Sequence, residues 1–340
     1  MTAIPTTAPS LVTLSDIQAA ADRIRNLVVR TPLLPCAWAE AGRPLWLKPE
    51  SLQATGAFKL RGASNALALL DAGQRARGVV AQSSGNHAQA VAYAAARLGI
   101  RATIVMPDTT PAVKLEATRA FGAEVMIVRP AERDIRPLEL VEQYGYAHIP
   151  PYDDPWIIAG QGTVGLEIAA DLAAGTGDPV PDTDGAPDLV LVPVSGGGLI
   201  SGVATAIKAL SPATRVIAVE PELAADAAES FRAGRRVTWT ADRTYRTIAD
   251  GLRTTSLGVL PFAHIREHVD AVVTVSEEEI VAAVRTLGRR SRLVAEPSGA
   301  VTTAAYLFHA SELPAASRTV AVVSGGNVDP AAYLGYFGGV

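Results

Sequence analysis

The chain has 340 residues, of which 49% are hydrophobic and 19% charged, a balance typical of a globular protein and unlike a disordered chain or a coiled coil. Its net charge is −4 and no block of like charge stands out, which argues against binding to nucleic acid or to an anionic membrane surface. Cys36 is the single cysteine, so neither an internal disulfide nor a thiolate metal cage can form. Residues 1–10 form a loose tail without the basic start and apolar core of a secretory signal, and no apolar run approaches the roughly 18 residues of a membrane span. We therefore expect a cytoplasmic protein.

The first predicted element is a helix that begins at Ser15, where Gln18 completes a capping box, and that Thr31-Pro32 ends. A short strand over 45–47 and a helix over 59–70 are expected next.

From residue 78 onward, apolar strands alternate with helices. The expected strands span 78–81, 102–106, 125–128, 189–194, 216–219, 271–275 and 320–324, and the expected helices span 86–98, 111–122, 199–210 and 277–287. Strands that are apolar throughout are typical of parallel sheets covered on both faces. The sequence therefore predicts an α/β protein with two open sheets, and a polar surface loop over 175–187.

The first motif with chemical meaning is Pro-Val-Ser-Gly-Gly-Gly-Leu over 193–199, where a strand runs into glycines and then a helix. Glycines let the backbone approach a ligand, and a helix start presents free N–H groups, so a phosphate fits there. A tight turn without a ligand is the alternative. Gly196, Gly198 and Ser201 also resemble an imperfect dinucleotide motif, with Glu220 as the ribose-binding acid, so an NAD-dependent oxidoreductase stays open.

Lys59 lies at the expected start of a helix, in the segment 51–62. The helix dipole disfavours a cation at that end, and a lysine with a depressed pKa can attack a carbonyl to form a Schiff base. An ordinary solvated lysine is the alternative.

Two further motifs follow expected strands. Gln-Ser-Ser-Gly-Asn-His-Ala over 82–88 offers N–H groups to a carboxylate, although Ser and Asn are also ordinary helix caps and His87 alone is more often a packed residue. Ser-Gly-Gly-Asn over 324–327 is, taken alone, a glycine-rich turn.

In this order and at this spacing, the sequences T-G-x-F-K-x-R-G, S-S-G-N-H, G-G-G-L and S-G-G-N resemble the fold-type II pyridoxal-phosphate (PLP) enzymes, in particular their serine/threonine dehydratase and serine racemase branch. The resemblance extends from about Leu14 to Asp329. It implies a tryptophan synthase β-like fold with two open, twisted, mainly parallel sheets and the site between two domains. The small domain, residues 79–156, would be inserted in a large PLP-binding domain of residues 1–78 and 157–340.

The resemblance also assigns roles. It implies that Lys59 forms a Schiff base with the cofactor and moves the Cα proton. The residues that it implies for cofactor binding are Phe58, Lys59, Asn86, Gly196, Gly197, Gly198, Leu199 and Ser324, and for the substrate carboxylate Ser83, Ser84, Asn86 and His87. Ser195 stands where many relatives have a further glycine, so this end of the phosphate loop is expected to differ.

The implied reaction is β-elimination from L-serine or L-threonine, giving pyruvate or 2-oxobutanoate and ammonia. Ser84 would supply the second acid–base group that racemisation needs, unless it only caps a helix, so serine racemase is an alternative and some of both activities is expected. Arg133 would favour a β-hydroxyaspartate substrate if it faces the pocket, and a surface-helix arginine is the other interpretation. An intact Lys59 argues against a non-catalytic amino-acid-binding relative.

Glu220, Ala224 and Asp226 match a divalent-cation site of this branch, built from two carboxylates and a backbone carbonyl. Oxygen ligands of this kind suit Mg²⁺ or Ca²⁺, and solvated surface carboxylates are the alternative. The expected partners are a small-molecule amino-acid substrate and a second copy of the chain in a homodimer, without nucleic acid or membrane.

Overall fold

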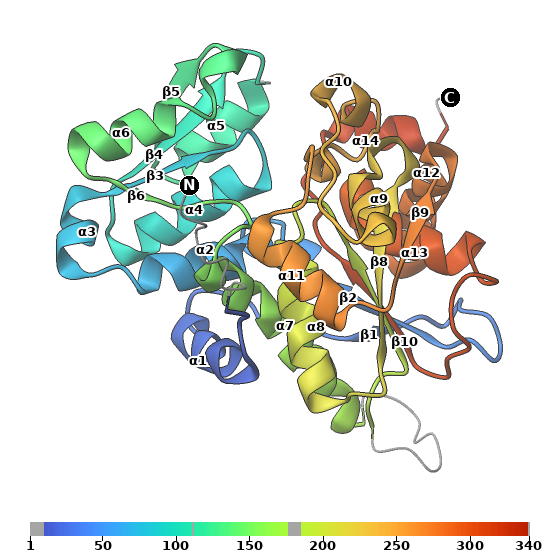
Figure 1. Cartoon of the computed structure of the whole chain (residues 1–340). Coiled ribbons are helices and arrows are strands. Elements are labelled where there is room, and N and C mark those ends of the chain that lie inside the picture. Colours follow the sequence, from blue (N-terminus) through green and yellow to red (C-terminus); the bar gives the residue numbers. More distant parts are fainter. Residues whose placement is uncertain (1–9, 111, 176–184, 339–340) are drawn as a thin grey trace, which may run out of the picture.

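The computed structural model describes residues 10–110, 112–175 and 185–338, which form two sheets surrounded by helices (Figure 1). Almost all of the tail expected over 1–10, the proline expected to begin a helix at residue 111 and most of the loop expected over 175–187 lie outside these residues. No helix in the described parts of the chain is long and apolar enough to cross a membrane. The predicted α/β class with two mainly parallel sheets is confirmed.

The larger sheet has six strands in the order β1-β2-β10-β7-β8-β9, and all neighbours are parallel except β1 and β2. Its strands are β1 (Leu34–Pro35), β2 (Leu45–Pro49), β7 (Leu189–Pro193), β8 (Arg215–Pro221), β9 (Ala271–Val275) and β10 (Thr319–Val323). The smaller sheet is parallel throughout, in the order β5-β4-β3-β6. Its strands are β3 (Val79–Gln82), β4 (Ala102–Pro107), β5 (Glu124–Val128) and β6 (Ala147–His148).

Helices cover both sheets. The α-helices are α1 (Leu14–Ile24), α2 (Lys59–Ala68), α3 (Ala72–Arg77), α4 (Asn86–Leu98), α5 (Ala112–Ala120), α6 (Arg136–Tyr144), α7 (Pro155–Ala173), α8 (Gly198–Leu210), α9 (Asp226–Ala233), α10 (Ala241–Thr244), α11 (Val259–His268), α12 (Glu277–Thr286), α13 (Pro297–Phe308) and α14 (Pro330–Tyr336). Short 3₁₀ turns are η1 (Glu50–Leu52), η2 (Pro130–Glu132), η3 (Glu222–Ala224) and η4 (Asp250–Leu252), and η5 (Leu287–Ser291) is a π-helical turn.

The larger sheet is buried on both faces, as its apolar strands predict. Along β7, Leu189 and Leu191 join the core beneath α12 and α13, whereas Val190 and Val192 join the core beneath α7, α8 and α11. Successive side chains of a strand point to opposite faces, so β7 contributes to two cores at once. Figure 1 shows the two groups of helices on either side of this sheet.

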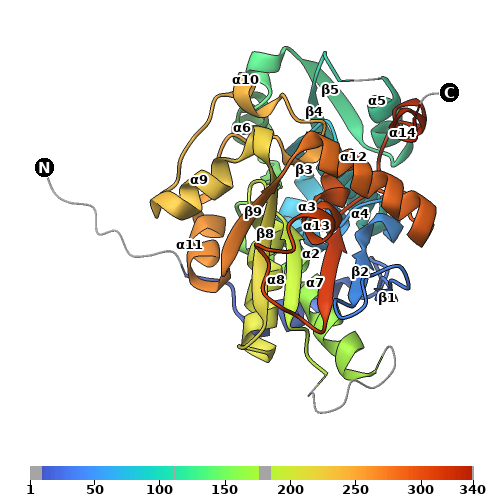
Figure 2. The ribbon, with the colours of Figure 1, turned by 90° about the vertical axis from the view of Figure 1, so that its right-hand side faces the viewer.

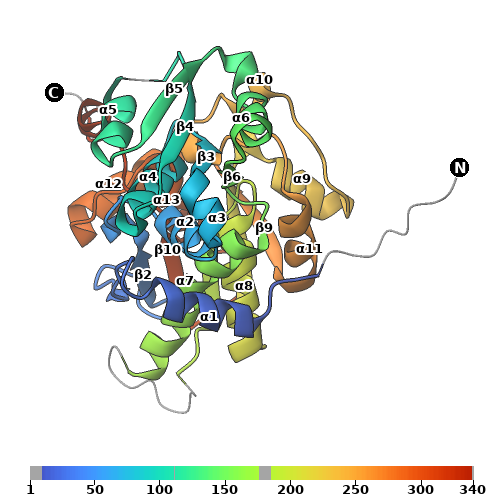
Figure 3. The same ribbon diagram turned by 90° about the vertical axis from the view of Figure 1, so that its left-hand side faces the viewer.

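α2 belongs to both parts of the molecule. Its Leu60 and Leu67 pack with Val79 and Ile104 in the core of the smaller sheet. On its other side α2 lies against α7 so closely that a Cβ atom on Gly160 would stand 2.7 Å from the carbonyl oxygen of Arg61. α1 in turn covers the outer side of α7 (Figure 3). This packing places the first residue of α2, Lys59, between the two sheets.

The predicted capping box at Ser15 is wrong by two residues. Thr13 is the N-cap of α1, because its hydroxyl accepts the N–H of Asp16 and the Asp16 carboxylate accepts the N–H of Thr13. This reciprocal pair satisfies two free donors of the first turn. The bounds of α4 and β9 agree with the prediction.

Candidate functional site

Lys59 begins α2 and its ammonium group is held by a main-chain oxygen. The preceding residue, Phe58, is the N-cap without a side-chain cap, and its half-buried ring lies 5.1 Å from Lys59 Nζ. Nζ donates to the carbonyl oxygen of Pro151 at 2.7 Å, and no carboxylate of the described residues pairs with it. Surrounding protein atoms exclude water and so lower the pKa of Lys59 to about 8, although its surface is not wholly covered. A substantial fraction of this amine is neutral near pH 7 to 8.

The start of α2 is joined to the end of β10. Ala57 and Gly325 form an isolated β-bridge, and the Phe58 N–H donates to the carbonyl oxygen of Ser324 at 3.0 Å. The Ser324 side chain is buried, and its Oγ donates only a long 3.4 Å hydrogen bond to the carbonyl of Ser298. Two motifs more than 250 residues apart in the chain therefore lie side by side, joined through their main chains.

Asn86, the first residue of α4, has a fixed amide orientation. Its Oδ1 accepts from Asn327 Nδ2 at 2.8 Å, and its Nδ2 donates to Glu296 Oε1 at 2.7 Å. An amide group has two N–H donors, so one donor of Asn86 remains for a ligand. Burial, and then the charge of Asp250, raise the pKa of Glu296 to about 8. Glu296 was not predicted as a site residue, and its only signal in the sequence is an acid that directly precedes Pro297 at a helix start.

The residues that precede α4 leave one hydroxyl free. Ser83 Oγ accepts the N–H of Gly85 at 3.1 Å, whereas Ser84 has no hydrogen bond to the described residues. Gly85 is the N-cap of α4 and no side chain caps this helix, so the alternative that Ser84 caps it is wrong. His87 donates through Nε2 to the carbonyl of Ile149 at 2.9 Å, and burial lowers its pKa to about 3, so the ring is a neutral, packed hydrogen-bond donor.

The glycine loop between β7 and α8 has the form that an anion site requires. Gly197 has a φ of +96°, and a Cβ atom there would stand 2.7 Å from Pro261 Cβ. A Cβ atom on Gly196 would overlap the Tyr152 ring at 2.4 Å. α8 begins at Gly198, followed by the buried Leu199, with no acidic side chain in its first turn. The free N–H groups of this first turn can therefore bind a phosphate.

The connection from β6 to α7 contacts Lys59, His87 and the glycine loop, and no sequence motif marks it. Within six residues, Ile149 and Pro151 present carbonyl oxygens to His87 and Lys59, and Tyr152 packs on the glycine loop. Across this boundary, Lys114 of α5 also pairs with Asp250 at 2.7 Å. Figures 2 and 3 show α5 and α6 facing the larger-sheet part of the molecule, opposite α14 and α10. The candidate site thus lies where the two sheets' carboxyl ends meet, as open α/β sheets predict.

Two residues after Lys59, Arg61 anchors α2 in a buried charge network. Its guanidinium donates to both carboxylate oxygens of Glu50, at 2.7 and 2.8 Å, and to both of Glu167, at 2.7 and 2.8 Å. Lys48 adds a second cation, 2.7 Å from Glu167. Two cations and two carboxylates therefore tie α2 to η1, α7 and β2.

The acids expected to hold a cation lie close together. Glu220, at the end of β8, accepts the N–H groups of Ala227 and Ala228 at 3.1 and 2.9 Å. Both carboxylate oxygens of Asp226 are buried without a hydrogen-bond partner in the described parts of the chain, and burial raises the pKa of Asp226 to about 7 and also raises that of Glu220. Ala224 is buried in η3 between them. Unpartnered carboxylate oxygens fit a divalent cation, although no group of three acidic, His or Cys side chains gathers there among the described residues.

Arg133 follows η2 and is half-buried. Its Nε is buried without a hydrogen-bond partner among the residues that the structure describes, and it lies 3.9 Å from the carboxylate of Asp134. Burial, Asp153, Asp134 and Asp226 raise the pKa of Tyr152, and Arg133 opposes this shift, so Arg133 acts on the ring that covers the glycine loop.

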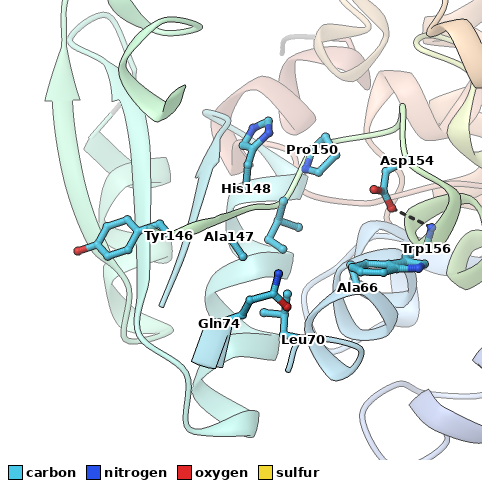
Figure 4. A pocket seen from close by; sticks show the side chains of 10 residues that line it. Ala66, Leu70, Gln74, Tyr146, Ala147, His148, Pro150, Asp154 and Trp156 are labelled. Carbon is cyan, nitrogen blue, oxygen red and sulfur yellow. Dashed lines mark hydrogen bonds between the residues drawn. The ribbon is translucent and has the colours of Figure 1, made fainter. Parts of the chain in front are cut away.

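Two cavities lie beside the predicted site residues. One of about 270 Å³ opens beside β6 between α2 and α7, lined by residues that include Leu70, Gln74, His148 and Trp156 (Figure 4). A second of about 620 Å³ lies between α1 and α7. Neither is lined by a predicted site residue.

These parts fit a phosphorylated aldehyde cofactor: a half-buried amine of lowered pKa, a glycine loop that opens a helix with free N–H groups, and a spare amide donor on Asn86. The family of pyridoxal-phosphate dependent enzymes matches residues 24–325, and the chain belongs to it. The predicted membership of the fold-type II PLP enzymes is confirmed, and the dinucleotide alternative is wrong. Glu220, which that alternative needs for a ribose, already accepts two N–H groups of α9.

The particular relatives are hydroxy-amino-acid enzymes. The L-threo-3-hydroxyaspartate ammonia-lyase of Saccharomyces cerevisiae is 40% identical over 94% of this chain and 95% of the yeast protein. The crystal structure of a threonine deaminase from T.th. is 47% identical with a TM-score of 0.85, covering 93% of this chain and 99% of that one. Maize serine racemase is 38% identical with a TM-score of 0.87, covering 96% and 97% of the two chains. The chain is thus an enzyme of the PLP-dependent ammonia-lyase and racemase type.

Proposed function

We propose that this enzyme eliminates the β-hydroxyl group of L-serine and L-threonine. Loss of water and hydrolysis of the released enamine give pyruvate or 2-oxobutanoate and ammonia. The observation that carries the proposal is the half-buried amine of Lys59, which donates to Pro151 in the same connection whose Tyr152 packs on the glycine loop. The similarity to threonine deaminase over 93% of the chain supports these substrates.

PLP, when bound, supplies an electron sink for the charge that remains at the substrate Cα atom. Lys59 removes the Cα proton, because its pKa of about 8 leaves part of the amine neutral, and Pro151 orients it. Ser83 and the free N–H groups before α4 hold the substrate carboxylate. The spare donor of Asn86 would bind the cofactor's phenolic oxygen, and Ser324 would bind its ring nitrogen.

The test is to incubate the purified protein with PLP and either L-serine or L-threonine, and to quantify 2-oxo acid and D-amino acid in the same sample. We expect 2-oxo acid in clear excess, and none from a Lys59→Ala variant. D-serine that forms as fast as pyruvate would make the protein a racemase instead. If neither product forms, the proposed substrates are wrong.

Arg133 favours a second candidate substrate, L-threo-3-hydroxyaspartate. Its buried, unpartnered Nε can donate to a second carboxylate, and the yeast relative acts on this substrate by name. We expect Arg133→Ala to lower kcat/KM for hydroxyaspartate about 10- to 100-fold, the size of hydrogen bonds to a charged group, and to leave L-threonine within about threefold. Arg136→Ala is the matched control, since Arg136 pairs with Glu139 on the surface. Equal effects on both substrates would remove this candidate.

We also propose that Glu220, Asp226 and the carbonyl of Ala224 bind Mg²⁺ or Ca²⁺. The support is the pair of buried Asp226 oxygens without a partner.

We infer a cytoplasmic homodimer, for which the support is a single cysteine and two exposed apolar residues, Leu52 and Val294, whose segments meet at Gly326. Light scattering of the wild type and of Leu52→Asp would test the dimer.

We propose that the chain divides into a small domain of residues 79–156 and a large domain formed by the remainder. The support is the smaller sheet, which is built wholly from residues 79–148.

A further inference from the structure

Two hydroxyl groups meet at the edge of the glycine loop. Ser195 Oγ, just before the three glycines, lies 2.7 Å from Thr254 Oγ1, which is 59 residues further along the chain. The Thr254 N–H donates to the same Ser195 oxygen at 3.4 Å. The Gly258 N–H also donates to the carbonyl of Gly196 at 3.0 Å, so the segment 254–258 runs alongside the loop.

One of the two hydroxyl protons of this pair is not needed for the hydrogen bond between Ser195 and Thr254. Each hydroxyl group carries one proton, and the 2.7 Å contact uses one of the two, whichever residue donates. Neither oxygen has another acceptor among the described residues. Both side chains are only half-buried, so the remaining proton is open to a ligand.

The surroundings of this donor suit an anion with several oxygen atoms. The adjoining glycine loop leads into the free N–H groups at the start of α8, and the first turn of α8 carries no acidic side chain. We propose that the Ser195–Thr254 pair donates its remaining proton to the cofactor phosphate, as a side-chain binding site beside the backbone N–H groups of the loop. The proposal rests on the phosphate-binding role given to this loop above.

Removal of both hydroxyl groups tests the proposal. We expect a Ser195→Ala/Thr254→Val variant to bind PLP about tenfold more weakly than the wild type, and to shift the ³¹P resonance of the bound cofactor. Each single variant keeps one hydroxyl but loses the partner that orients it, so we expect its affinity for PLP to fall only about two- to fivefold. Because the two hydroxyls are in contact, the loss in the double variant should differ from the product of the two single losses. The Thr254→Ser variant keeps the hydroxyl and loses only the methyl group, so it should bind PLP like the wild type.

Ser256→Ala is the matched control, because Ser256 lies in the same segment without a hydrogen bond to the loop in the described structure, and it should leave PLP affinity unchanged. The proposal is wrong if the double variant binds PLP within twofold of the wild type with an unshifted ³¹P resonance. It is also wrong if only KM for L-threonine rises, since the hydroxyls would then face the substrate. If the wild type itself binds no PLP, the proposed function fails instead. The single variants keep the test valid should the double variant not fold.

Discussion

Lys59 Nζ and the carbonyl oxygen of Pro151 are joined by a hydrogen bond of 2.7 Å, although 92 residues separate them in the chain. The first begins α2, and the second lies in the connection that leaves the smaller sheet. A carbonyl oxygen accepts from a neutral amine as well as from an ammonium group, so this contact orients Lys59 without fixing its charge.

The pH dependence of cofactor attachment follows from Lys59. Only the neutral amine attacks an aldehyde, and the pKa of about 8 means that the neutral fraction grows as pH rises through 8. We therefore expect the rate of PLP attachment to the cofactor-free protein to rise from about pH 7 to about pH 9 and then to level off. Stopped-flow absorbance measures it, and borohydride reduction with peptide mapping identifies the residue. A rate that is flat over this range would contradict the lowered pKa.

Ser84→Ala should separate the two reactions. The Ser84 hydroxyl has no partner among the described residues and does not cap α4, so its loss removes a proton carrier and leaves the helix intact. We expect D-serine formation to fall about 100-fold or more, pyruvate formation to change less than about threefold, and Tm to stay within about 1 °C. Chiral chromatography, a pyruvate assay and calorimetry measure the three quantities. If the rates of D-serine and pyruvate formation fell equally, Ser84 would contribute only to substrate binding and not to proton transfer.

A divalent cation should stabilise the wild type through Asp226. A cation that binds only the folded state raises the free energy of unfolding by about 2.7 kcal/mol at 100 times its Kd, a shift of several degrees in Tm. We expect this shift with Mg²⁺ or Ca²⁺, its reversal by EDTA, and its absence in Asp226→Asn. Glu222→Gln, which changes an exposed acid of the same turn, is the control. Identical shifts in both variants would place the cation elsewhere.

Arg61→Ala should destabilise the fold far more than an exposed arginine substitution does. It would leave Glu50 and Glu167 buried without their main cation, a loss of about 3–5 kcal/mol of unfolding free energy. Arg25→Ala, which breaks only an exposed pair with Asp22, should cost under about 1 kcal/mol. Urea unfolding compares the two. A loss below about 1 kcal/mol for Arg61→Ala would mean that water or neighbouring cations replace it.

Much of the architecture follows from local sequence patterns. The strands are continuous apolar runs and the helix α4 has an amphipathic period, and both patterns lie within the element itself, so these elements are readable from the sequence without any tertiary contact. The motifs around Lys59, Ser84, Gly197 and Ser324 follow strands or begin helices. Because parallel strands bring their carboxyl ends to one edge, their convergence was predictable too.

The helices that were not predicted include those buried on nearly all sides. Every residue of α13 from Pro297 to Tyr306 is buried, and α7 is buried around most of its circumference and presents glycines to α2 and α8. Such a helix has no polar face, so the 3.6-residue period that marks surface helices is absent.

Sequence alone therefore determined the class of the fold and the chemical groups of the site, because motifs and periods are local. Tertiary structure alone decided the partners of those groups. Pro151 orients Lys59, Glu296 holds Asn86 from 210 residues away, and Thr254 meets Ser195. It also decided that the Ser84 hydroxyl has no partner among the described residues, because hydrogen bonds depend on which segments the fold brings together. Hydrogen bonds and burial depend on distances between segments that no local pattern records, and these contacts set the pKa of Lys59 and the direction of each donor.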